Sequence, residues 1–203
     1  MLDLYFDSEK HYYYYKGEKV NCVSDVLKTV DAISLEGIPP RNLEIAAERG
    51  TIVHQLTDDY DYGGIDLLDD EWVEENYEYY NYVIAYANFT KQYPNKPITS
   101  EEQLYSEKYD FAGTLDLVKY IDGEIAIVDK KTSKTISKLR SILQLNLYRL
   151  MWNENHPDLK CDKLYILQLT ENAEYRLLPI EVDENKALLY LNIFKEIKGD
   201  EKI

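Results

Sequence analysis

The sequence predicts a mixed α/β fold in which helices cover the faces of a central β-sheet. Three runs with the residue types of strands lie at 98–104, 111–121 and 124–131. An amphipathic segment typical of a helix follows Ser137, and a further strand is expected at 163–169. The order helix, three strands, helix and strand favours a layered α/β sandwich with a mixed sheet.

The N-terminal part, residues 1–95, is expected to be mainly helical. Short strands are predicted within 4–22, and Ser24 is expected to cap a short helix that follows it. Pro40 suits the first turn of a second helix, which runs through the segment IAAERGTIVHQLTDDY. One long helix is predicted over 70–93, where a proline follows.

The rest of the chain is expected to supply the sheet and its covering helices. Residues 96–182 form the core sheet with one helix, including a last strand at 175–182. Asp183 is expected to cap a terminal helix, so 183–203 form the C-terminal helix. No stretch has the composition of a linker, and we therefore expect one domain over 1–203.

The composition is that of a globular chain with a strong acidic excess. Hydrophobic residues make up 45% of the 203 residues, so a real core is available. The formal net charge of −15 opposes nonspecific affinity for nucleic acids, because that affinity rests on lysine and arginine. No apolar run is long enough to cross a bilayer and the N-terminus lacks the blocks of a signal peptide, so we expect a cytoplasmic protein with no membrane partner.

The two cysteines, Cys22 and Cys161, lie far apart in the sequence. They form no CxxC pattern and are too few for an all-cysteine iron–sulfur site. We therefore expect buried reduced thiols and no iron–sulfur cluster.

A predicted hairpin brings two aspartates together. Asp122 and the glycine after it form a strong two-residue turn signal between apolar runs, which places Asp116 directly opposite Asp129. Side chains in such a pair have Cβ atoms about 4.5–5.5 Å apart, and like charges there destabilise a sheet. Strand alternation puts Lys131 on the face of Asp129. A divalent ion with hard oxygen ligands, Mg²⁺ or Mn²⁺, is the natural second cation.

This group of two acids and a lysine suits phosphodiester hydrolysis. A metal between carboxylates activates water and neutralises phosphate charge, and a lysine stabilises the charge that develops. The alternative is ordinary charges on a sheet surface, because a single bulge would break the register.

Other polar residues add weaker signals. Gln144 and Tyr148 share one helix face, and either packing or contact with a phosphate or base explains them. His54 is a structural residue or a metal ligand. Strand alternation aims one of two neighbouring glutamates, at 101 and 102, toward the site, and we select Glu102. Thr132 binds phosphate or starts the loop after Lys131.

Four motifs together resemble the PD-(D/E)xK nuclease superfamily, and more narrowly its RecB-like and phage-type exonuclease branch. In chain order they are RGTIVH ending at His54, GTLD ending at Asp116, VDKKTS with Asp129 and Lys131, and QLNLY with Gln144 and Tyr148. They follow the order and spacing of the family across residues 49–148. Each motif is degenerate alone, and the specificity lies in their succession.

The resemblance implies a restriction-endonuclease-like core and assigns roles to residues. It makes Lys131 the catalytic lysine, and it makes Gln144 and Tyr148 contacts to the substrate near the scissile bond. The implied metal ligands are Asp116, Asp129 and His54, and Glu102 is an additional acidic residue. Our own mechanistic hypothesis adds the backbone carbonyl of Lys130 as an extra ligand. The chain departs from the family pattern in having Leu115 where the family name has proline.

We therefore expect a metal-dependent DNA nuclease, an exonuclease of phage or prophage DNA recombination or repair, with Mg²⁺ or Mn²⁺ as cofactor. A recombination partner protein is a further expected interaction, and a homo-oligomer is open because some relatives form rings. The alternative is a noncatalytic module on the same scaffold, whose acidic, tyrosine-rich surface binds a protein or imitates DNA. We favour the nuclease, because a binding module has no need for the opposed carboxylates and the lysine together.

Overall fold

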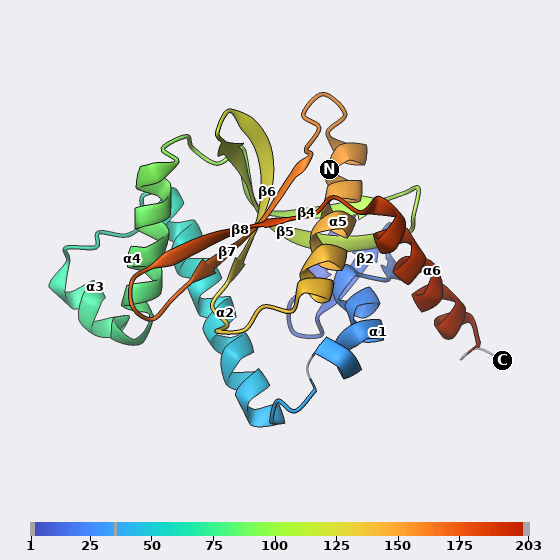
Figure 1. Cartoon of the computed structure of the whole chain (residues 1–203), viewed down its shortest axis with the longest axis horizontal. Coiled ribbons are helices and arrows are strands. Elements are labelled where there is room, and N and C mark those ends of the chain that lie inside the picture. Colours follow the sequence, from blue (N-terminus) through green and yellow to red (C-terminus); the bar gives the residue numbers. More distant parts are fainter. Residues whose placement is uncertain (1–2, 35, 201–203) are drawn as a thin grey trace.

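The computed structural model describes residues 3–34 and 36–200, in which helices surround two β-sheets (Figure 1). The N-terminal elements are β1 (Leu4–Asp7), β2 (Tyr12–Tyr15), β3 (Glu18–Val20), α1 (Val23–Ser34), α2 (Pro40–Asp61), α3 (Asp70–Glu75) and α4 (Tyr77–Gln92). The later elements are β4 (Thr99–Ser106), β5 (Phe111–Ile121), β6 (Glu124–Lys131), α5 (Lys138–Asn155), β7 (Lys163–Leu169), β8 (Tyr175–Ile180) and α6 (Glu184–Asp200). The expected N-terminal part, 1–95, and the expected C-terminal helix, 183–203, also include residues 1, 2, 35 and 201–203, which lie outside the described residues.

The main sheet has five strands in the order β4-β5-β6-β7-β8. Strands β6 and β7 are parallel, and the other neighbours are antiparallel. A parallel pair needs a crossover connection, and α5 supplies it. The predicted mixed α/β fold is confirmed, and its strands lie within two residues of the expected positions.

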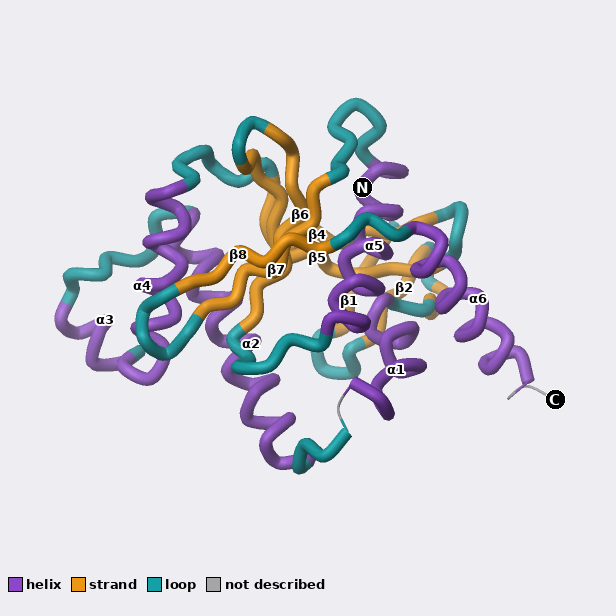
Figure 2. Tube along the Cα trace, in the orientation of Figure 1, coloured by secondary structure: helices purple, strands orange, loops and turns teal. Residues whose placement is uncertain are grey.

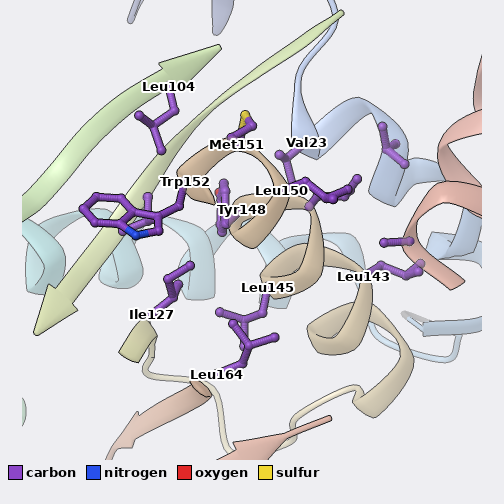
Figure 3. Close-up of a cluster of buried hydrophobic side chains, with 14 of the residues drawn as sticks. Val23, Leu104, Ile127, Leu143, Leu145, Tyr148, Leu150, Met151, Trp152 and Leu164 are labelled. Atoms are coloured by element: carbon purple, nitrogen blue, oxygen red, sulfur yellow. The ribbon is translucent and has the colours of Figure 1, made fainter. Parts of the chain in front are cut away.

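Helices cover both faces of the main sheet. Figure 2 shows α2 and α4 on one side of the strands and α1, α5 and α6 on the other. Apolar side chains of α5 pack on the sheet in one core cluster, in which Tyr148 and Trp152 lie near Leu104 and Ile127 (Figure 3). Full burial of such a side chain is worth about 1.5–3 kcal/mol, so α5 is firmly fixed against the sheet. A second cluster, which includes Val53 of α2, fills the other face.

Two helix boundaries differ from the expectation. Helix α1 begins before Ser24, because the carboxylate of Asp25 accepts a hydrogen bond from the backbone N–H of Cys22 and closes the first turn at 3.1 Å. The long helix expected over 70–93 is divided at Asn76, where the backbone leaves the helical conformation with φ of −110° and ψ of 20°. Within the described residues, every helix is too short or too polar to cross a membrane.

Candidate active site

The hairpin of β5 and β6 has the predicted turn and register. Asp122 and Gly123 adopt φ of 51° and 83°, as a two-residue turn of this type requires. The strands pair from Ile121 with Glu124 up to Leu117 with Val128. The ladder ends there, so the expected direct pairing of the next two residues, both aspartates, is wrong.

Asp116 is not part of this ladder, because its side-chain carboxylate accepts a hydrogen bond from the backbone of β6. Its Oδ2 accepts the N–H of Lys130 at 2.8 Å, and the Asp116 side chain is buried. The negative charge of Asp116 still acts on Asp129, where it raises the pKa of that carboxyl group. The two acids therefore belong to one electrostatic site, although they are not a backbone pair.

Lys131 and Asp129 form an ion pair on the α5 face of the sheet. The Nζ atom of Lys131 lies 2.6 Å from Oδ2 of Asp129, whose side chain is only 1% exposed. Burial raises the pKa of Asp129 to about 6, and Lys131 acts in the opposite direction. Burial lowers the pKa of Lys131, but the charges of Asp129 and Asp116 outweigh this effect and raise it overall.

A polar cluster, formed by His54, Glu101 and Asp116, brings the imidazole of α2 next to two carboxylates. Its Nε2 donates to the carbonyl oxygen of Lys130 at 2.9 Å and lies 3.6 Å from Oδ2 of Asp116. Its Nδ1 lies 3.5 Å from Oε1 of Glu101. Burial lowers the pKa of His54, but Asp116 and Glu101 raise it above its ordinary value. One ligand atom from each of these three residues lies within 4.8 Å of the others.

These residues fit a divalent metal. Oε1 of Glu101 and both carboxylate oxygens of Asp129 are buried and accept no aligned hydrogen bond from the described residues. A buried carboxylate oxygen without an aligned hydrogen bond is costly. The ammonium groups of Lys130 and Lys131 offset part of this cost, and a divalent ion would offset more of it. Carboxylate and carbonyl oxygens suit hard divalent ions, and imidazole is also a common ligand of divalent metals, so this donor set fits a divalent ion.

The structure places Glu101 in this cluster, and the expectation of Glu102 is wrong. Oε1 of Glu102 instead lies 2.8 Å from Nε2 of His156, at the C-terminal end of α5. Glu101 adopts φ of 49° in the middle of β4, which interrupts the alternation of side chains there. Since strand alternation was the basis for choosing between the glutamates, this irregularity explains the error.

Lys130 contacts all three members of this polar cluster, His54, Glu101 and Asp116. Its N–H binds Asp116, its carbonyl oxygen accepts from His54, and its ammonium group lies 3.0 Å from Oε1 of Glu101. The ammonium group also donates to Oγ1 of Thr57 at 3.1 Å. The sequence analysis gave only the carbonyl of Lys130 a role. The signal for the side chain is the pair of consecutive lysines after Asp129, which alternation sends to opposite faces.

Comparison with known protein families identifies the superfamily of this chain. The family model of the PD-(D/E)XK nuclease superfamily matches residues 26–189, which is most of the chain. The chain belongs to this superfamily.

Two solved structures are also similar at low sequence identity. One is a candidate exonuclease from Eubacterium rectale, with 17% identity and a TM-score of 0.47 over 73% of this chain, which spans 64% of that protein. The other is the protein SSO0001, with 12% identity and a TM-score of 0.47 over 87% of this chain and 74% of that protein. A search of curated proteins yields no match.

Tyr148 of this PD-(D/E)XK protein lies close to the acids of the site. Burial raises its pKa well above the ordinary value, and the charges of Asp116 and Asp129 act in the same direction. Gln144, one turn before it in α5, acts on this pKa in the opposite direction. The two predicted substrate contacts of α5 are thus neighbours of each other and of the aspartates.

The glycine of the GTLD motif makes room for this tyrosine. A Cβ atom at Gly113 would lie 2.9 Å from Cε1 of Tyr148 and 3.0 Å from Cγ2 of Val23. The motif glycine therefore allows α5 to pack closely over β5 and to carry Tyr148 into position.

The site opens into a cleft of about 680 Å³. One wall is the surface of α2, where Ala46, Gly50 and Thr51 leave space beside His54. Thr132 closes another side and is held there by Arg49, whose Nε donates to its Oγ1 at 3.2 Å. The small side chains on this wall leave His54 and Glu101 accessible from the cleft.

Proposed function

We propose that this protein is a divalent-metal-dependent deoxyribonuclease of the RecB-like branch, and that it is an exonuclease of phage or prophage DNA recombination or repair. The observation that supports the proposal most is the ion pair of Lys131 with the buried Asp129, at 2.6 Å. It lies beside a cluster with the donor chemistry of a metal site, in a chain of a nuclease superfamily. DNA is the proposed substrate.

The proposed metal ligands are His54, Glu101 and Asp116, with Asp129 and the carbonyl oxygen of Lys130 completing the set. The donors suit Mg²⁺ or Mn²⁺. When bound, such an ion supplies Lewis acidity, which acidifies water and neutralises charge on a phosphate.

Lys131 supplies a fixed positive charge to the reaction. Its ammonium group donates hydrogen bonds to the attacking water or to a phosphate oxygen. Negative charge develops as the water oxygen bonds to phosphorus and the bond to the leaving sugar oxygen breaks, and the ammonium group stabilises this charge. Gln144, Tyr148 and Thr132 are proposed to orient the substrate. Tyr148 suits this role because burial, together with the nearby carboxylates, raises its pKa and keeps its hydroxyl group protonated and able to donate.

Digestion of end-labelled linear DNA with Mg²⁺ or Mn²⁺ tests this proposal. The wild type is expected to cleave, and Lys131→Ala and Asp116→Asn to lower the rate by about 10²–10³-fold. Lys163→Ala is the matched control, because Lys163 begins β7 at the other end of the sheet, where it pairs with Glu124. A covalently closed circular substrate tests the exonuclease assignment, since an exonuclease leaves it intact. Equal cleavage by the wild type, Lys131→Ala and Asp116→Asn would remove the assigned site.

The net charge of −15 supports a second candidate, a noncatalytic module that binds a protein or imitates DNA. This candidate predicts that calorimetry finds no Mn²⁺ site dependent on Asp116 and Asp129. It also predicts no cleavage with either metal. Metal binding together with Lys131-dependent cleavage excludes it.

A further inference from the structure

A second pocket adjoins the cleft on the far side of the loop that follows β6. Its volume is about 240 Å³, and it lies between this loop, Tyr82 of α4 and the hairpin of β7 and β8. Thr132 and Ser133 line both the cleft and this pocket. A linear ligand that occupies the cleft can therefore continue into the pocket.

The buried floor of the pocket holds the loop in place. Nε2 of Gln168 donates to the carbonyl oxygen of Ser133 at 2.7 Å and to that of Lys134 at 3.2 Å. Gln168, Thr132 and Tyr82 are each only 6–7% exposed. Because these contacts fix the loop backbone, the pocket is formed before any ligand arrives.

Positive charge gathers around this pocket, although the chain as a whole carries a net charge of −15. Arg176 is exposed on β8, and no carboxylate of the described residues lies within 4.0 Å of its guanidinium group. Arg49 stands behind Thr132, and in the part of the chain that the structure describes its hydrogen bonds go to the hydroxyl and carbonyl oxygens of Thr132, with no carboxylate within 4.0 Å. Lys134 also lines the pocket, where it is paired with Glu171 at 2.8 Å. Two basic side chains, Arg176 and Lys134, thus line the pocket with one acidic side chain, Glu171, and Arg49 lies behind its wall.

Two of the other arginines are arranged differently, whereas Arg41 is exposed and, within the described residues, also has no carboxylate within 4.0 Å. Arg140 is paired with Asp31, and Arg149 is paired with Asp162 and Glu184. The positive charges of Arg140 and Arg149 are therefore balanced by carboxylates of the protein itself. The guanidinium group of Arg176 remains available for an external anion.

We infer that this pocket binds a phosphate group of the nucleic-acid strand whose neighbouring phosphodiester lies in the cleft. The inference rests on the proposed nuclease function for the class of its ligand. A guanidinium group binds two oxygens of a phosphate at once, and hydroxyl groups add donors. Arg176 supplies the guanidinium group, Ser133 supplies a hydroxyl, and Lys134 adds a charge. The phosphate is an internal diester or the monoester at a strand end.

Fluorescence anisotropy with internally labelled oligonucleotides in EDTA tests this site without cleavage. The probes are one sequence with no terminal phosphate, with a 5′-phosphate and with a 3′-phosphate, each as single strand and duplex. The proteins are the wild type, Arg176→Gln, Arg176→Lys and Lys160→Gln. Lys160 is the matched control because it is an exposed cation before β7, at the end of that strand remote from the pocket.

Arg176→Gln is expected to bind the wild type's preferred probe about tenfold more weakly, as for loss of a hydrogen-bonded charge. The slope of log K against log salt is expected to fall by about 0.7 for a single strand or 0.9 for a duplex. Arg176→Lys is expected to bind with intermediate affinity, since it keeps the charge but not the planar donor pair. An equal loss on all three end types supports an internal diester, and a loss confined to one phosphorylated end supports the terminal monoester.

The inference is overturned if Arg176→Gln binds every probe as well as Lys160→Gln does, or if the wild type binds none of them. Its failure is distinct from failure of the nuclease proposal. Arg176-dependent binding without any cleavage by the wild type would contradict the nuclease alone. Lys131-dependent cleavage without an effect of Arg176 on binding would contradict the pocket alone.

Discussion

The ammonium group of Lys130 lies 3.0 Å from Oε1 of Glu101, and its side chain is only 1% exposed. Glu101 adopts φ of 49°, in the left-handed region. Such a conformation costs a residue other than glycine about 1–3 kcal/mol and persists only where the surroundings hold it. The ion pair with Lys130 is one contact that holds it, on the opposite face of β6 from the pair of Lys131 and Asp129.

Removal of the Lys130 charge is expected to destabilise the fold. Lys130→Met keeps the apolar stem but leaves Glu101 without its cation and Thr57 without a donor. We expect a loss of about 1–3 kcal/mol in the free energy of unfolding. The double variant with Glu101→Gln is expected to lose less than the sum of the single variants, because the two residues share one interaction. Urea denaturation measures all four proteins.

Lys119→Met is the matched control for this cycle. Lys119 is also about 1% exposed, but its ammonium group donates to the carbonyl oxygen of Tyr93 and has no acidic partner among the described residues. Its effect is expected to add to that of Glu101→Gln without coupling. Equal coupling of both lysines to Glu101 would contradict the specific pair.

Metal affinity is expected to distinguish two neighbouring glutamates. Glu101→Gln removes a proposed ligand charge, whereas Glu102→Gln changes only the contact with His156. We expect Glu101→Gln and Asp116→Asn to weaken Mn²⁺ binding by on the order of tenfold or more. Loss of a residue that only hydrogen-bonds to a metal ligand already lowers metal affinity by about tenfold. Isothermal titration calorimetry with Mn²⁺ measures the affinities. A greater loss in Glu102→Gln than in Glu101→Gln would reverse the assignment.

Much of the site follows from local rules that the sequence displays. The turn at Asp122 fixes the register of the hairpin, and alternation then places Lys131 beside Asp129. The choice between the glutamates failed because the positive φ of Glu101 depends on contacts with residues distant in sequence. The break at Asn76 was missed for a related reason, since the helical pattern of side chains continues across it.

The motif glycine offers a test of the packing behind the site. Gly113→Ala is expected to lower the free energy of unfolding by about 1–3 kcal/mol, because its Cβ would press on Tyr148, Val23 and Met151. Gly50→Ala is the matched substitution, with nothing within 4 Å of the new Cβ in α2. It is expected to raise stability by about 0.4–1 kcal/mol. Thermal and urea unfolding compare the two, and a stability loss at Gly50 as large as at Gly113 would refute the crowding argument.

The buried thiols are expected to make the fold sensitive to alkaline pH. Burial raises the pKa of Cys22 and of Cys161 to about 11, against 9.0 for an ordinary thiol. Between these values the unfolded chain releases thiol protons that the folded chain retains, so stability falls as pH rises. The thiols' contribution is fully present below pH 9 and is lost toward pH 11.

Urea unfolding at pH 8 and pH 10 measures this effect. The decrease in the free energy of unfolding is expected to be larger in the wild type than in a variant with Cys22→Ala and Cys161→Ala. Thiol-specific labelling at pH 8 is also expected to be much slower in the folded wild type than in urea, because both thiols are buried. Identical pH dependence with and without the cysteines would contradict the assignment.

The central claim is that the acids and His54 form one metal site next to Lys131. The most direct test is a crystal structure of the protein soaked in Mn²⁺, with an anomalous difference map. The account predicts a peak among His54, Glu101 and Asp116, in contact with the carbonyl oxygen of Lys130. A Mn²⁺ peak only elsewhere on the protein, or none at this cluster at saturating Mn²⁺, would contradict it.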